Sequence, residues 1–165
     1  MNVKSLKKRI RVVLVFFIVA LAFSGLTAFP LEWELGLLNR LVADPASSVP
    51  ALWPGLAEWI AFVYRGVQDT HRQYPFMAYG TDWLAFAHLV IAVAFWGPLK
   101  DPVRNIWVIE FGMIACVLVI PLALIAGPIR GIPFFWQLVD CSFGVFGIIP
   151  LWLCRRDILR LEAAI

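Results

Sequence analysis

Three ionisable residues stand inside long apolar stretches of the sequence: His88, Glu110 and Asp140. An ionisable group is costly in hydrocarbon, so its presence there favours a functional role. Imidazole titrates near neutral pH, and a carboxylate beside it would complete an acid–base pair for proton transfer. His88 and Asp140 are therefore the first candidates for chemistry.

Depth and helical face predict that His88 and Asp140 meet. His88 lies about 12 Å and Asp140 about 9–12 Å from the outer ends of their predicted helices, whereas Glu110 lies about 8 Å from the opposite end. Thr81 shares the face of His88, and Gln137 shares that of Asp140, together with small residues that let helices approach closely. We expect a His88–Asp140 contact with these two polar neighbours. Glu110 is either a further polar-site residue or a side chain that reaches the interface.

Cys116 and Cys141 fall near the same depth as this pair. Thiolate and imidazole are ligands for zinc or copper, but no Cys-x-x-Cys or His-x-x-x-His spacing occurs. Asp140 and Cys141 are adjacent, so they diverge by about 100° around a helix. A buried cysteine that packs as a small apolar residue is the favoured interpretation. We predict no metal site, and the sequence identifies no cofactor.

Four apolar segments must position these residues. The chain is 62% hydrophobic and 15% charged, which is too apolar for a soluble domain. About 20 apolar residues suffice for one helix to cross a bilayer. The sequence therefore predicts an all-α membrane protein, a single membrane domain built as a four-helix transmembrane bundle. Its predicted spans are 12–29, 80–99, 105–127 and 132–154.

The first span has an alternative interpretation as a cleaved signal peptide. It has a basic start, and Ala22-Phe23-Ser24 is a weak cleavage site of the small-x-small type. Its apolar run of about 18 residues is longer than the usual signal-peptide core, which favours an uncleaved anchor.

The distribution of positive charge predicts the orientation. Ten of the 14 Lys and Arg residues lie in 1–11, 100–104 and 155–165, on one side of the membrane if the spans alternate. The positive-inside rule then places both termini in the cytoplasm and 30–79 outside, in the cell (inner) membrane. The formal net charge of +3 comes from these flanks and does not indicate binding of nucleic acid.

The external segment 30–79 is expected to hold one or two amphipathic helices, over 31–43 and 54–72. The second has an apolar stripe that includes Trp59, Val63 and Tyr64. Such a helix fits the outer membrane surface or the mouth of the bundle. His71 falls on the same stripe as a further polar-site candidate; the alternative is a histidine that is hydrogen-bonded at the interface.

Asp82 and Arg130 are predicted to lie at the outer ends of spans, where they could form an ion pair at the rim. No motif in the chain names a reaction, so whether it is an enzyme stays open.

Three functions compete. The favoured one is a non-catalytic membrane subunit or binding protein for an apolar, lipid-like ligand or a membrane partner. The second is an intramembrane enzyme that acts on a lipid-like substrate with a His88–Asp140 acid–base pair. The third is an oligomeric transporter linked to protons or metal ions. The expected partners are the lipid bilayer, a lipid-like ligand or another membrane protein; the identity of the ligand, the oligomeric state and the physiological process stay open.

Overall fold

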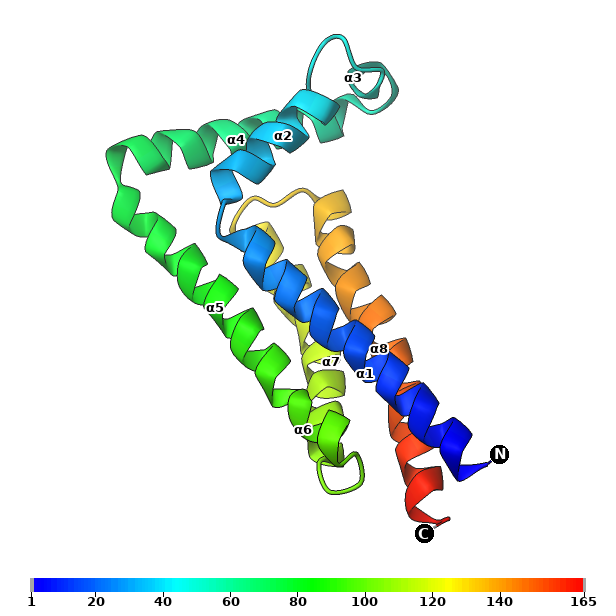
Figure 1. The fold of residues 1–165 in the computed structure, drawn as a ribbon. Coiled ribbons are helices and arrows are strands. Elements are labelled where there is room, and N and C mark those ends of the chain that lie inside the picture. The colour runs from blue at the N-terminus through cyan, green and yellow to red at the C-terminus, as the bar shows by residue number, and fades with distance from the viewer. Residues whose placement is uncertain (1, 165) are drawn as a thin grey trace. The chain divides into compact units, whose positions relative to one another are not determined.

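The computed structural model describes residues 2–164, which form helices and turns without a strand; the chain is 86% helical (Figure 1). The elements are α1 (Val3–Ala28), α2 (Leu31–Val42), α3 (Val49–Leu52), α4 (Pro54–Gln73), a 3-10 turn (Pro75–Met77), α5 (Ala78–Ala94), α6 (Trp96–Lys100), α7 (Ile106–Ile129) and α8 (Phe134–Glu162).

Four helical stretches are long and apolar enough to cross a membrane: α1, Pro75–Lys100, α7 and α8. In the most apolar window of each, no more than 28% of the residues are buried inside the protein. Most apolar side chains therefore face outward, which is unfavourable in water but suits contact with lipid tails. The prediction of an all-helical protein with four helices of membrane-spanning length is confirmed.

The helices divide into two compact units. The terminal unit comprises Met1–Ala20 and Ile91–Ile165, and the middle unit comprises Leu21–Val90. In the terminal unit α7 and α8 lie side by side along their lengths (Figure 1). Their close approach depends on glycine: a Cβ atom on Gly112 would lie 3.0 Å from the side chains of both Leu151 and Phe95. A residue without a side chain at this position leaves room for the large side chains of the neighbouring helices.

The first and last of the long helices, α1 and α8, extend beyond the predicted spans. α1 already begins at Val3, and α8 runs through to Glu162. The reason lies in an apolar stripe that continues past the basic residues of α8, with Leu151, Cys154, Ile158 and Leu161 all buried. The segments 1–11 and 155–165, which were predicted as flanks of the spans, are thus largely helical extensions of them.

Span 80–99 is divided in the structure into α5 and α6. Pro98 has no backbone N–H and cannot donate to the carbonyl of Ala94, which is where α5 ends. Phe95 occupies the break, is 1% exposed, and stacks on Phe17 of α1 with ring centroids 5.3 Å apart. The break therefore also anchors α6 in the terminal unit.

In the middle unit α2 packs alongside α4 (Figure 1). Gly36 of α2 lies against the Tyr64 ring, 3.3 Å from where its Cβ would be. On α4, Ala57 and Ile60 are buried while Glu58 and Arg65 are exposed. The final turns of α1 also approach α5, because a Cβ on Gly25 would lie 2.8 Å from the Ala85 carbonyl oxygen.

Candidate functional site

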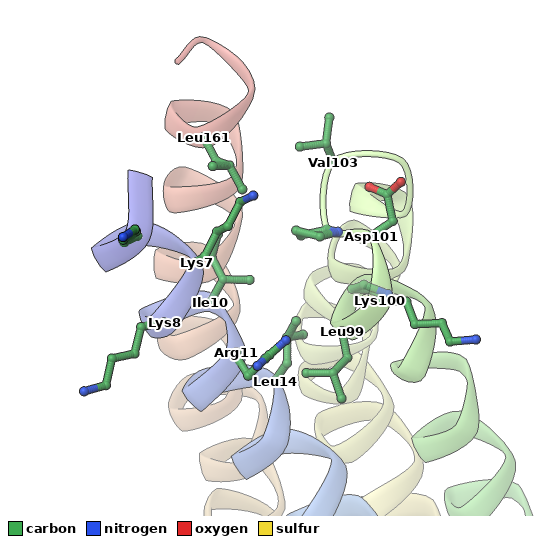
Figure 2. Close-up of a pocket in the computed structure, with 13 residues that line it drawn as sticks. Lys7, Lys8, Ile10, Arg11, Leu14, Leu99, Lys100, Asp101, Val103 and Leu161 are labelled. Atoms are coloured by element: carbon green, nitrogen blue, oxygen red, sulfur yellow. The ribbon is translucent and has the colours of Figure 1, made fainter. Parts of the chain in front are cut away.

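The terminal unit contains a cavity of about 660 Å³ between α1, α6, the turn that follows α6, and the last turn of α8 (Figure 2). We call it the basic cavity. Its cationic lining residues are Lys4, Lys7, Lys8, Arg11 and Lys100, and Asp101 is its acidic one. Its apolar lining includes Ile10, Leu14, Pro98, Leu99 and Leu161. The cavity thus combines an apolar floor with a predominantly cationic rim.

An ion pair holds the α1 wall of the basic cavity against α8. Arg9 Nη2 lies 3.2 Å from Asp157 Oδ2, and the side chain of Asp157 is 3% exposed. Arg156 Nε is 3.9 Å from the other carboxylate oxygen, and its guanidinium lies 5.3 Å from the centre of the Trp152 ring. A buried carboxylate needs such cationic partners, so Asp157 sets where α1 can dock.

A second ion pair joins α8 to α7. Arg155 Nε donates a hydrogen bond of 2.8 Å to Glu110 Oε1, and both side chains are about 40% exposed. The carboxylate of Glu110 thus has a cationic partner on α8, and whether it reaches the membrane interface stays a prediction.

The turn between α6 and α7 forms the opposite wall. Asp101 Oδ1 accepts a 3.1 Å hydrogen bond from the backbone N–H of Arg104. Asn105 Nδ2 donates to the carbonyls of Gly97 (3.2 Å) and Asp101 (2.9 Å). These bonds close the turn on itself, so the wall that carries Lys100 is built by local hydrogen bonding.

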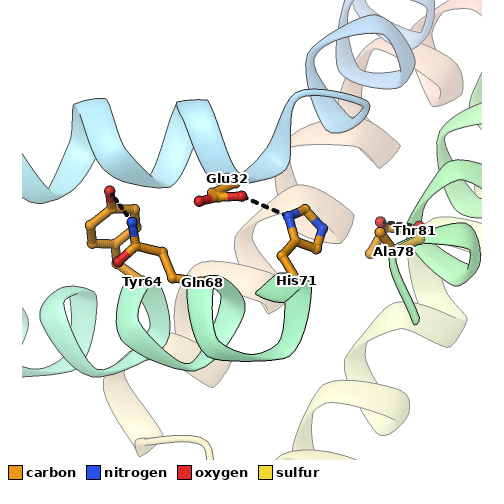
Figure 3. Close-up of polar contacts among 6 residues, drawn as sticks. All are labelled: Glu32, Tyr64, Gln68, His71, Ala78 and Thr81. Atoms are coloured by element: carbon orange, nitrogen blue, oxygen red, sulfur yellow. Dashed lines mark hydrogen bonds and ion pairs between the residues drawn. The ribbon is translucent and has the colours of Figure 1, made fainter. Parts of the chain in front are cut away.

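A smaller cavity of about 430 Å³ lies on the α2–α4 pair of the middle unit, lined in part by Trp33 and Arg40. Two of its lining residues contact each other: His71 Nδ1 lies 2.7 Å from Glu32 Oε2 (Figure 3). Glu32 is in the first turn of α2 and His71 in the last turn of α4, where the helix dipoles favour an anion and a cation respectively. His71 thus has a hydrogen-bond partner on α2, and its position at the membrane interface stays a prediction.

His88 and Asp140 lie in different units. In the middle unit, His88 Nδ1 bonds to the Leu84 carbonyl at 2.8 Å. A carbonyl only accepts, so Nδ1 carries the proton. In the terminal unit, Asp140 lies on α8 and is partly buried. The His88–Asp140 contact, which would join residues of two units, stays a prediction, and so does the rim pair of Asp82 with Arg130.

Three further candidates have local packing partners. Gln137 is 4% exposed, and its Nε2 donates to the Ile132 carbonyl at 2.7 Å, at the turn between α7 and α8. Thr81 Oγ1 donates to the Ala78 carbonyl at 2.7 Å (Figure 3). The Cys116 thiol is free and faces Gly147, where an added Cβ would lie 2.9 Å from Sγ.

The basic cavity and the Arg9–Asp157 pair were not anticipated from the sequence. The charged residues of both lie in segments that were interpreted only as charged flanks. A signal for Asp157 exists, because it follows Cys154 by three residues and precedes Leu161 by four, which places an acid on a buried helical face.

No family model matches the chain, and no curated protein or solved structure matches it either. Function is therefore inferred from the chain's own residues.

Proposed function

We propose that this chain is a non-catalytic, multi-pass protein of the cell (inner) membrane whose four transmembrane helices form a bundle that binds a lipid-like ligand in the basic cavity. The observation that carries the proposal is the composition of that cavity, about 660 Å³ with an apolar floor and a charged rim. A concave, mostly apolar site with a few polar groups is the usual form of a small-molecule site. An amphiphile would match it with its chain on Leu14 and Leu99 and its headgroup at the rim.

The charge distribution supports an orientation in which both termini are cytoplasmic. The basic start of α1 and the basic end of α8 belong to one unit, and the positive-inside rule assigns them to the cytoplasm. α2 and α4 then lie outside as amphipathic helices at the membrane surface, and the exposed Glu58 and Arg65 would face water.

Cysteine labelling tests the orientation. In a background that lacks the native cysteines, a membrane-impermeant maleimide applied from outside is expected to modify Ser47→Cys. Ser5→Cys should react only after the membrane is permeabilised, because it would lie on the cytoplasmic side. The reverse pattern would contradict the orientation.

Native mass spectrometry tests ligand binding. The detergent-solubilised protein is incubated with an equimolar mixture of dioleoyl phosphatidylcholine, phosphatidylethanolamine and phosphatidylglycerol, and the bound lipid is counted. We expect one lipid molecule to be retained per protein chain. Leu99→Trp should abolish its retention, because Leu99 lines the cavity and the larger ring would fill the floor.

Val93→Trp is the matched control, since Val93 is 73% exposed and is not a lining residue of the basic cavity. This variant should retain lipid as the unaltered protein does. Failure to retain any of the three lipids, or equal retention in the unaltered protein and Leu99→Trp, would overturn the proposed function.

A further inference from the structure

The basic residues of α1 are divided between two faces of the helix. Arg9 is engaged by the buried carboxylate of Asp157 on α8. Lys4, Lys7 and Arg11 follow one another at spacings of three and four residues, so they share a face, and all three line the basic cavity. Arg9 thus holds α1 against α8, while Lys4, Lys7 and Arg11 face the basic cavity.

The lining has an excess of positive charge. It contains five cationic side chains and one acidic one, and Asp101 Oδ1 already accepts the backbone N–H of Arg104. Figure 2 shows Arg11 extending into the gap between α1 and Leu99, whereas Lys8 and Lys100 point away from it. Arg11 and Lys7 are therefore the cations best placed to meet a bound group.

Charge and apolar surface are stacked along the helix axis. Leu14 lies three residues beyond Arg11 on the same face of α1, about 4.5 Å further along. A phosphate held at the level of Arg11 would place the attached chains beside Leu14 and Leu99, both of which line the floor. Free phosphate would use the cations but would leave the floor uncovered.

We propose that the basic cavity binds the phosphate headgroup of an anionic lipid, with Arg11 and Lys7 as its principal contacts. This inference rests on the proposed function and adds to it the charge of the ligand. Guanidinium binds phosphate oxygens through paired hydrogen bonds, and ammonium adds a point charge. Basic pockets at the cytoplasmic ends of transmembrane helices have the chemistry for such headgroups.

The test compares two double variants that remove the same charge. Lys7→Gln/Arg11→Gln removes two cations that line the basic cavity, and Arg104→Gln/Arg160→Gln removes two exposed cations of the same unit that do not line it. Each protein is titrated with dioleoyl phosphatidylglycerol or dioleoyl phosphatidylcholine, and binding is followed by native mass spectrometry. We expect the unaltered protein to prefer phosphatidylglycerol by about 25-fold, since Arg11 and Lys7 each contribute roughly fivefold. Lys7→Gln/Arg11→Gln should lose this preference and Arg104→Gln/Arg160→Gln should keep it.

Every other outcome overturns the inference. Equal binding of the two lipids by the unaltered protein would contradict recognition of an anionic headgroup but leave the proposed function standing. Binding of neither lipid would contradict both proposals. Equal losses in the two double variants would assign the preference to general flank charge. Displacement of phosphatidylglycerol by millimolar inorganic phosphate would assign the site to free phosphate. All four altered side chains are exposed, so the variants are expected to fold, which a matching thermal unfolding midpoint would verify.

Discussion

Arg9→Ala is expected to lower the free energy of unfolding by about 1–3 kcal/mol, because it leaves the buried Asp157 carboxylate without its closest cation. A fully buried pair would lose more, about 3–5 kcal/mol, but the Arg9 side chain is 45% exposed and solvent screens part of the interaction. Arg156 remains nearby, with its Nε 3.9 Å from the carboxylate, and limits the loss further. The measurement is unfolding in mixed micelles under increasing denaturing detergent.

A double-mutant cycle separates this pair from the general loss of positive charge. Asp157→Ala removes the buried acid, so the combined variant should cost less than the sum of the two single changes. Lys8→Ala is the charge control: its side chain is exposed and lies on the same turn of α1 as Arg9, so its effect should stay within about 0.5 kcal/mol. Additive single changes, or an equal loss in Lys8→Ala, would show that Arg9 and Asp157 do not act as a pair.

The helical content of the protein could be predicted from the sequence because membrane spans have a strong signal. Runs of apolar residues near 20 in length leave few alternatives, so all four helices of membrane-spanning length were anticipated. The ends of the helices could not be predicted equally well. A hydropathy signal stops where Lys and Arg begin, yet Leu6, Ile10, Ile158 and Leu161 continue the packing on one face. The division of α5 from α6 depends on a missing hydrogen-bond donor at Pro98, which hydropathy does not register.

The candidate site was harder to anticipate for a physical reason. A search for ionisable residues within apolar runs selects His88, Glu110 and Asp140, but it passes over charges in basic flanks. Glu110 meets Arg155, and Asp157 meets Arg9, and in each pair the two residues are far apart in the sequence. Such pairs depend on the rotation of each helix about its axis. That rotation is set by close contacts at glycine positions of the neighbouring helix, which the sequence of one helix does not reveal.

Gly144→Ala is expected to disrupt the packing of α8 against α7 and to lower the free energy of unfolding by about 1–3 kcal/mol or more. A Cβ at this position would overlap the Cys116 carbonyl oxygen and lie 2.7 Å from Val119 Cγ1. The carbonyl belongs to the backbone of a continuous helix and cannot rotate away, so the two helices would have to separate. Gly80→Ala is the matched control, since nothing lies within 4 Å of its added Cβ, and it should be neutral or slightly stabilising.

Gly147→Ala provides a graded comparison on the same helix. Here the added Cβ would meet the Cys116 Sγ atom at 2.9 Å, which is an obstacle from a side chain rather than from the backbone. We therefore expect a smaller loss of stability than in Gly144→Ala, and we expect Cys116→Ala to restore much of it, because that change removes the sulfur. The same Cys116→Ala change should not restore Gly144→Ala, whose obstacle is the carbonyl oxygen that alanine retains. Equal rescue of both glycine variants, or no loss in Gly144→Ala, would contradict the close backbone packing of α7 and α8.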